Sequence, residues 1–242
     1  MKLHRKIAKL FGYELIKTRK HPSTNSHVIN LIHDYGIDLV IDVGANNGQF
    51  GRMIREEGYQ GDIHSFEPVS KTYELLKENC ANDPKWFTHK IALGDSCGEE
   101  DVNVTELSLL SSFLKPNDFG KRQIKKMMVL HTETVEMSTL ETFVKQHIPD
   151  ALDKRIFLKM DTQGYDLKVF KGAEGIFSNI FCILSEISLI PIYSDMPHYL
   201  DVLKEYESSE FVVTGFYPVC RDKNLSLIEM DCMLVNKKRM MI

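Results

Sequence analysis

The chain has 242 residues, of which 43% are hydrophobic and 26% are charged, and its formal net charge is -4 at pH 7. These values are typical of one globular domain of the larger sort, or of one domain with an appendage. The slight acidic excess argues against a dedicated nucleic-acid binder, because such proteins usually carry a basic surplus. The five cysteines are scattered and form no Cys-x-x-Cys pair. We therefore expect free thiols in a reducing, cytoplasmic compartment, with neither a disulfide framework nor a zinc site.

The first 36 residues are expected to form an N-terminal helical extension, followed by the main domain over residues 37–242. Apolar residues recur at helical spacing over residues 7–17, and basic residues surround them. Such a helix can lie on an anionic membrane or on an acidic partner. We favour packing on the domain itself or on a second subunit, which leaves a homodimer open. No stretch has the pattern of a signal peptide or of a transmembrane segment.

Residues 39–43 are apolar except for Asp42 and show no alternation of polar and apolar residues, which indicates a buried parallel strand. A turn containing Gly44 and Gly48 follows, and a helical pattern occupies residues 49–57. Glycine in such a turn permits positive φ and lets a ligand approach the backbone closely. A strand, a glycine turn and a helix N-terminus together are typical of a cofactor site.

The residues around this turn indicate which cofactor it holds. Ala45 replaces the middle glycine of the dinucleotide fingerprint, and Asp42 would repel a pyrophosphate but suits an ammonium or sulfonium group. A second strand ends at Glu67, whose carboxylate can accept hydrogen bonds from both ribose hydroxyls. The pattern therefore predicts S-adenosylmethionine rather than NAD. The residues expected to contact it are Asp42, Gly44, Ala45, Asn46, Gly48, Glu67, Pro68 and Asp95.

The remaining pattern alternates helices and strands. Helices are expected over residues 26–35, 70–81, 138–147 and 166–177, and strands over 87–93, 101–105, 127–135, 155–161 and 180–185. Asp95 follows the first of these strands, where a polar group can hold adenine, although aspartate is also an ordinary turn residue. The long irregular segment 108–126 is expected to form part of an acceptor pocket or its lid.

Carboxylates follow several of the predicted parallel strands. An apolar strand that begins near Arg155 ends in Asp161, and the next strand ends near Glu186. Ligands bind outside the carboxyl ends of strands in open α/β sheets, so these acids can face the same crevice as Glu67. The last two strand-like runs, 211–220 and 225–236, are too close for a parallel crossover and must form an antiparallel hairpin. The predicted fold is therefore α/β, with a mainly parallel sheet and an antiparallel edge.

Taken together, these motifs resemble the FkbM-type family of S-adenosylmethionine-dependent methyltransferases. The resemblance rests on residues 42–49, 66–68, 158–166, 171–173 and 186–189, and it extends from about residue 37 to 235. It implies the class I methyltransferase fold, a Rossmann-like, seven-stranded, mainly parallel sheet with an antiparallel C-terminal hairpin and helices on both faces. It also implies O-methylation of a hydroxyl group, often on a sugar, a glycan or a secondary metabolite. Gln163 and Asp166 depart from the family pattern, in which many members carry glutamate at both positions.

A hydroxyl is a poor nucleophile at neutral pH and needs a base or a metal ion. We expect Asp161 to be the catalytic base, or else to bind a divalent cation together with Asp166 and Glu186. The expected partner is a small-molecule or glycan acceptor. Nucleic acid is disfavoured because no base-flipping methyltransferase motif is present. Two alternatives stay open: a nucleotide-dependent oxidoreductase, against which the glycine turn argues, and an inactive S-adenosylmethionine-binding scaffold, which the departure at Gln163 allows.

Overall fold

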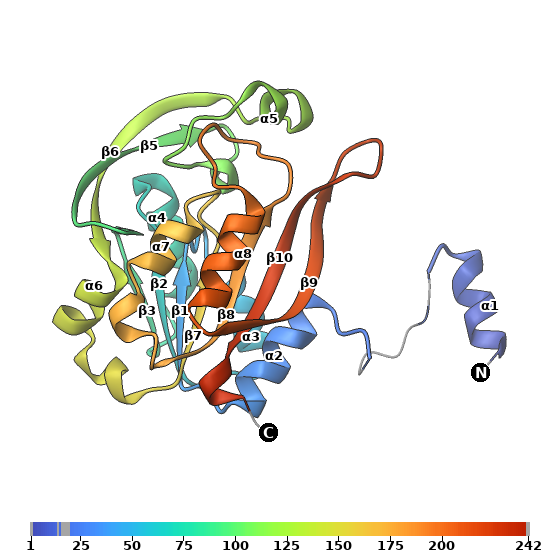
Figure 1. The fold of residues 1–242 in the computed structure, drawn as a ribbon, viewed down its shortest axis with the longest axis horizontal. Coiled ribbons are helices and arrows are strands. Elements are labelled where there is room, and N and C mark those ends of the chain that lie inside the picture. The colour runs from blue at the N-terminus through green and yellow to red at the C-terminus, as the bar shows by residue number, and fades with distance from the viewer. Residues whose placement is uncertain (1, 14, 16–19, 241–242) are drawn as a thin grey trace.

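The buried apolar runs of the sequence assemble into a seven-stranded sheet (Figure 1). The structure is a computed structural model that describes residues 2–13, 15 and 20–240. The strands follow one another across the sheet in the order β3-β2-β1-β7-β8-β10-β9. Their bounds are β1 Leu39–Val43, β2 Asp62–Phe66, β3 Trp86–His89, β7 Ile156–Met160, β8 Ile180–Ser188, β9 Phe211–Arg221 and β10 Leu227–Asn236.

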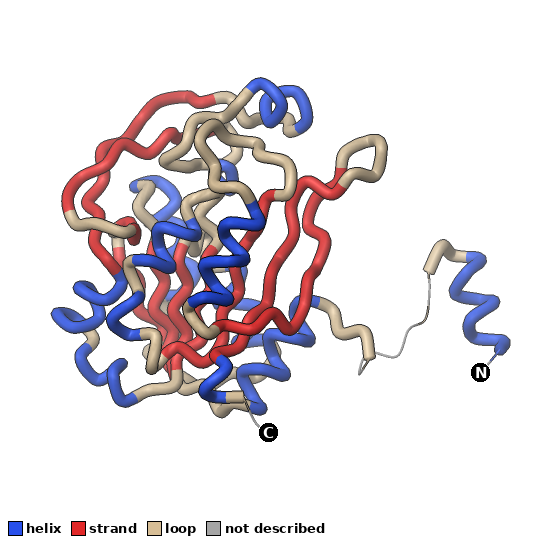
Figure 2. Tube along the Cα trace, viewed as in Figure 1, coloured by secondary structure: helices blue, strands red, loops and turns tan. Residues whose placement is uncertain are grey.

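The direction of the strands agrees with the prediction. The neighbouring strands β3, β2, β1, β7 and β8 pair parallel, whereas β10 pairs antiparallel with both β8 and β9. The short connection between β9 and β10 permits only a hairpin, because a parallel pair needs a longer crossover. The mainly parallel sheet with an antiparallel C-terminal hairpin is therefore confirmed. Figure 2 shows the strands in the middle of the domain with helices around them.

Helices cover both faces of this sheet. Their bounds are α2 Thr24–Asp34, α3 Gln49–Glu56, α4 Ser70–Cys80, α6 Leu140–His147, α7 Asp166–Lys171 and α8 Tyr199–Ser208. Successive side chains of a strand point to opposite faces. Leu39 and Ile41 of β1 accordingly pack in one buried cluster with α6, α7 and α8, whereas Val40 packs in another with α2, α3 and α4. The helices on both faces confirm the predicted class I methyltransferase architecture.

A second, three-stranded sheet was not predicted. Its order is β4-β6-β5, formed by Ala92–Gly94, Val129–Thr139 and Gly98–Thr105. The single strand predicted over residues 87–93 is wrong, because the chain leaves the main sheet after His89 and Ala92 then pairs with Met137. The expected irregular segment between β5 and β6 contains a 3-10 turn at Ser108–Leu110 and the short helix α5 at Asp118–Gln123.

Several predicted helices start or end at other residues, and one helix was missed. Helix α6 begins after Thr139, whose hydroxyl accepts the backbone N–H of Thr142, while Ser138 still belongs to β6. The helix expected over 166–177 ends at Lys171 as α7. Gly172 follows it, and a Cβ atom there would lie 1.9 Å from the carbonyl oxygen of Gly94. Helix α8 was not predicted at all.

The first helix, α1, spans Lys2–Leu10 rather than residues 7–17, of which 14, 16 and 17 lie outside the described residues. It lies apart from the domain (Figure 1), so the expectation that it packs on the domain is wrong. Within the described part of the chain, no helix is both long and apolar enough to cross a membrane.

Candidate functional site

The turn after β1 has the backbone that the two glycines predict. Gly44 and Gly48 have φ angles of +70° and +87°, in the left-handed region that favours glycine. A Cβ atom on Gly44 would lie 2.0 Å from the carbonyl oxygen of Asp161, so the chain passes here in direct contact with the end of β7. The backbone N–H groups of Gly44 and Ala45 both donate to the carbonyl oxygen of Phe66. The turn is thereby fixed between the ends of β2 and β7.

Glu67 holds its carboxylate beside this turn. Its Oε2 accepts the backbone N–H of Asn46 and its Oε1 accepts that of Val69, each at 3.0 Å. The residue is only 6% exposed. Burial raises the pKa of Glu67 to about 7, although the two backbone donors oppose this shift. A carboxylate oxygen can accept more than one hydrogen bond, so each oxygen keeps capacity for a ligand hydroxyl.

A cavity opens in front of Glu67, and we call it the Glu67 cavity. The space between its walls is about 610 Å³, which includes a part that is open to solvent. Residues at the ends of β1, β2 and β7 form one side of it, and the apolar strand β4 forms another. Residues of the segment between β5 and α5 close it from outside. The lining residues used below are Gly44, Asn46, Glu67, Pro68, Ser108, Leu109, Ser112, Asp161 and Gln163.

A second cavity, the Lys159 cavity, lies on the other side of the glycine turn. It has an empty volume of about 740 Å³ and is lined by residues of α2, α3, β7, β8 and β10. Its polar walls come from Thr24, Asn25, Gln49, Lys159, Asp161 and Asp231. The two cavities share four lining residues, which are Gly44, Asn46, Leu109 and Asp161. They therefore meet at the turn and at the end of β7.

A buried ion pair supports the floor between the two cavities. Asp42 and Lys159 are direct neighbours in the register of β1 and β7, and Lys159 Nζ lies 3.0 Å from Asp42 Oδ1. The same ammonium group donates to the carbonyl oxygens of Val43 and Gly44. Burial opposes the charge of Lys159, but the carboxylates of Asp42 and Asp161 outweigh burial and hold its pKa above the usual value. Lys159 was missed from the sequence, although a lysine inside a buried apolar strand signals a charged partner.

The predicted contact residues occupy different places around the cavities. Four of them line the Glu67 cavity, and these are Gly44, Asn46, Glu67 and Pro68. Ala45 lines the Lys159 cavity. Asp42 and Gly48 line neither: Asp42 is fully buried behind the turn, and Gly48 packs against Leu76 and Trp86. Asp95 is exposed, lies 4.0 Å from Lys168 and lines neither cavity. In its place, Ala92 and Leu93 of β4 form this wall of the Glu67 cavity.

Asp161 lies where the two cavities meet. Its side chain is 41% exposed, and its Oδ1 accepts a hydrogen bond from Gln163 Nε2 at 3.2 Å. Its Oδ2 lies 3.7 Å from Lys159 Nζ. The second amide N–H of Gln163 donates to Glu186 Oε2 at 2.8 Å. Gln163 therefore bridges the two carboxylates as a neutral donor and does not contact Asp161 Oδ2.

Tyr193 connects this centre to the segment that covers the Glu67 cavity. Its hydroxyl lies 2.9 Å from Gln163 Oε1 and 2.8 Å from the carbonyl oxygen of Leu110, so its single proton serves one of them at a time. Ser112 Oγ donates to the backbone carbonyl of Gln163, and Asn46 Nδ2 donates to Ser108 Oγ. The cover is thus attached to both the glycine turn and the end of β7. Tyr193 carried no recognisable signal in the sequence.

Further carboxylates surround Asp161. Burial, followed by the negative charge of Asp161, raises the pKa of Glu186 well above its usual value. The same two causes raise the pKa of Glu229 to about 7 and that of Asp231 to about 6. These two side chains come from β10, next to β8 in the sheet. Carboxyl groups that hold their protons to a higher pH than usual are therefore close enough to Asp161 to feel its charge.

The carboxylates predicted as metal ligands do not form a ligand set. Asp166 Oδ1 accepts the backbone N–H and the hydroxyl of Thr162, and its Oδ2 accepts Ser185 Oγ and the backbone N–H of Glu186. All four of its acceptor positions are therefore used inside the protein. Among the described residues, no group of three or more histidine, cysteine, aspartate or glutamate side chains is arranged to hold a metal ion. The structure therefore does not support the divalent cation that the sequence predicted at Asp161, Asp166 and Glu186.

Comparison with known proteins gives one decisive match. A family model described as the methyltransferase FkbM domain matches residues 42–209, more than half of the chain. The search of curated proteins gave no match.

Similar solved structures include three methyltransferase-fold proteins. A putative RNA methyltransferase from Pyrococcus horikoshii is 11% identical with a TM-score of 0.43, covering 96% of this chain and 98% of its own. Fibrillarin from Aeropyrum pernix with bound S-adenosyl-L-methionine is 9% identical with a TM-score of 0.45, covering 82% and 66%. A TehB-like S-adenosylmethionine-dependent methyltransferase from Corynebacterium glutamicum is 11% identical with a TM-score of 0.40, covering 86% of each chain. At such low similarity the family match alone identifies the chain.

Proposed function

Because the chain belongs to the FkbM-type family of methyltransferases, we propose that it transfers a methyl group from S-adenosylmethionine to a hydroxyl group of a small-molecule or glycan acceptor. One observation carries the finer part of this proposal. Asp161 is the only carboxylate, among the residues that the structure describes, that lines both the Glu67 cavity and the Lys159 cavity. A proton acceptor thus lies between a place for the cofactor and a place for an acceptor.

The Glu67 cavity fits S-adenosylmethionine. The carboxylate of Glu67 is aimed by two backbone donors and can accept both ribose hydroxyls. The wall formed by Ala92 and Leu93 is apolar and suits the face of an adenine ring. Gly44 keeps the backbone of the turn free of a side chain, so that the methionine end can approach it.

Glu67→Gln is expected to weaken the binding of S-adenosylmethionine about tenfold or more. Both Glu67 oxygens accept a backbone N–H, so the new amide group of glutamine would face one of these donors. A hydrogen bond to a charged group contributes about 1.5–3 kcal/mol, which corresponds to this loss. Isothermal titration calorimetry measures it, with the exposed Glu74→Gln as the matched control. An unchanged dissociation constant would remove Glu67 from the cofactor site.

The chain's own residues account for activation of the acceptor. Bound S-adenosylmethionine supplies an electrophilic methyl group, so alignment of the acceptor hydroxyl is the main requirement. Asp161 takes the hydroxyl proton on Oδ2, the oxygen that Gln163 does not engage. Lys159 cannot take this proton because its raised pKa keeps it protonated. The Asp161 side chain is 41% exposed, so its proton can return to solvent after transfer.

Gln163→Glu is expected to lower turnover at pH 7 about tenfold or more and to move the pH–rate profile upward. The substitution replaces a neutral donor by a third acid between Asp161 and Glu186, and carboxyl groups this close retain a shared proton. The titratable side chains around Asp161 and Glu186 are those of Lys159, Asp166, Glu229 and Asp231, and the hydroxyl of Tyr193 lies next to Gln163. Turnover is measured from pH 6 to 9 with Gln60→Glu, an exposed site, as control. Higher activity in the glutamate variant would contradict the bridging role of Gln163.

The proposed reaction is tested with S-adenosylmethionine carrying a labelled methyl group. The protein is incubated with neutral sugars, oligosaccharides and hydroxylated metabolites, and the products are examined for an ether-linked methyl group by mass spectrometry. The Asp161→Asn variant serves as the background. Label found only on nitrogen or sulfur atoms would overturn O-methylation while leaving the methyltransferase family assignment in place.

A further inference from the structure

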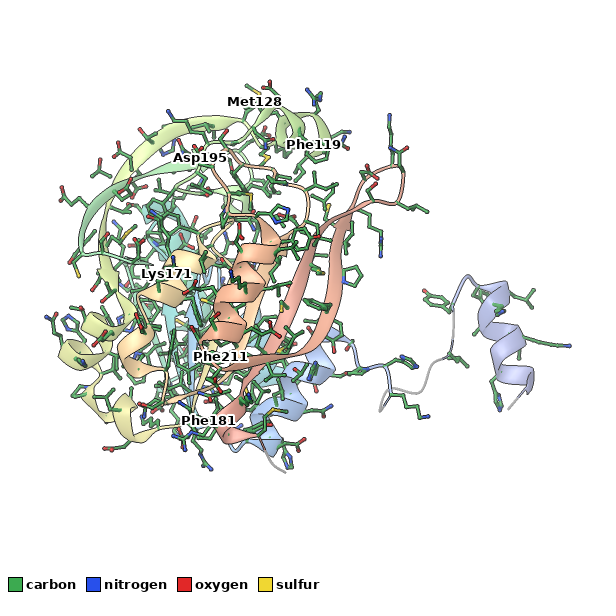
Figure 3. All side chains as sticks on the ribbon, in the orientation of Figure 1. Phe119, Met128, Lys171, Phe181, Asp195 and Phe211 are labelled. Carbon is green, nitrogen blue, oxygen red and sulfur yellow. The ribbon has the colours of Figure 1, made fainter. Side chains whose placement is uncertain are left out.

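Helix α1 and the described residues just after it expose apolar side chains to solvent. Ile7, Leu10 and Phe11 are 47%, 84% and 74% exposed, and Tyr13 and Leu15 beyond them are 70% and 51% exposed. In Figure 3 the side chains that are drawn on α1 point into open space, and α1 stands at a distance from the domain. Single exposed apolar residues are common, but a contiguous set of them marks an interaction surface.

The residues of α1 divide into two faces. Leu10 lies three residues after Ile7, which places both on one side of the helix, and Phe11 follows directly in the turn after α1. Among the described side chains of α1, the basic ones of Lys6 and Lys9 recur at the complementary spacing. No acidic residue occurs before position 14. The helix therefore combines an apolar face with a purely basic one.

This combination selects among the kinds of partner. Nucleic acid would satisfy the basic face but leave Leu10 and Phe11 in water. A second copy of α1 would cover the apolar face but bring two sets of cations together. An anionic bilayer surface satisfies both faces, because its headgroups attract the cations and its acyl boundary accepts the apolar side chains. A nine-residue helix is about 14 Å long, so it can lie in the interface but cannot span it.

We propose that α1 binds the surface of membranes that contain anionic lipid and thereby holds the methyltransferase domain next to them. The apolar face of Ile7, Leu10 and Phe11 enters the interface between headgroups and acyl chains, and the lysines contact the headgroups. The proposal goes beyond the methyl-transfer reaction and does not depend on the identity of the acceptor.

Vesicle co-sedimentation of the full chain tests this proposal. The wild type is expected to sediment with vesicles of phosphatidylcholine and phosphatidylserine and to remain in solution with phosphatidylcholine alone. Leu10→Ser/Phe11→Ser should abolish sedimentation, since both side chains are exposed and the fold does not need them. Lys6→Glu/Lys9→Glu should weaken it about 20-fold or more, because each basic residue near an anionic surface changes affinity about fivefold.

Matched variants separate these effects from general changes of the surface. Leu200→Ser removes an exposed leucine of α8, and Lys71→Glu/Lys77→Glu makes the same change in net charge on α4. Both should sediment like the wild type. Equal binding to neutral and anionic vesicles would overturn the proposal. So would a wild-type dimer in gel filtration that fails to bind vesicles and becomes monomeric in Leu10→Ser/Phe11→Ser, because α1 would then join two copies of the chain.

Discussion

Asp161→Asn is expected to lower turnover about 100-fold or more while the affinity for S-adenosylmethionine stays nearly constant. Asparagine has the same shape, and its side-chain oxygen can still accept the hydrogen bond from Gln163 Nε2. What the variant loses is the oxygen that takes the acceptor's proton. Because Asp161 borders both cavities, the loss should fall on the chemical step rather than on the binding of either ligand.

Turnover and cofactor affinity must be measured together, by methyl transfer and by calorimetry. The control is Asp201→Asn, an exposed aspartate of α8. If the asparagine variant loses affinity but keeps turnover at saturation, Asp161 orients the methionine end of the cofactor and is not the base. If both values match the wild type, Asp161 has only a structural role.

Gly44→Ala is expected to abolish cofactor binding and to lower the free energy of unfolding by about 2–5 kcal/mol. The new Cβ atom would lie 2.0 Å from the Asp161 carbonyl oxygen, and overpacking of this kind costs about 1–3 kcal/mol. The φ angle of +70° adds about 1–2 kcal/mol of backbone strain for a residue with a Cβ. Any relaxation must also move Asp161 away from the junction of the cavities.

Chemical denaturation measures this loss, and Gly58→Ala provides the matched control. Gly58 has a φ angle of +94°, but a Cβ atom there would meet nothing within 4 Å. This control therefore retains the backbone strain and lacks the clash. We expect a loss of about 1–2 kcal/mol for Gly58→Ala with normal cofactor binding. Equal losses in the two variants would show that contact with β7 does not matter at Gly44.

The central part of the fold could be predicted because its signals are local. The apolar run 39–43 became β1 with the same ends, since a strand buried on both faces needs no alternation. The hairpin of β9 and β10 followed from the length of its connection alone. The run over 87–93 looked like one strand, yet its second half pairs with β6, some forty residues further on. That pairing depends on contacts between distant parts of the chain, which periodicity does not record.

In the site, too, the residues with a local sequence signal were predicted and those placed by distant contacts were not. Gly44 and Glu67 were predicted because a turn and a strand end each leave a pattern within a few residues. Gln163 was noticed only as a departure from relatives, and its partners Glu186 and Tyr193 come from later elements. The metal prediction failed for the same reason. Sequence order brought Asp161 and Asp166 close together, but it could not show that Asp166 is already saturated by hydrogen bonds from its own surroundings.

The ion pair between Asp42 and Lys159 has a consequence for how this sequence can change over time. Asp42 is fully buried, so losing the ammonium group alone would leave a charge without a counter-ion, which is far worse than losing both partners. The two positions lie 117 residues apart in the chain but are neighbours across two strands. Substitutions at one are therefore tolerated only in descendants that have also altered the other. A change in the strand before the glycine turn is therefore coupled to a change in β7, the strand that carries Lys159 and ends just before Asp161.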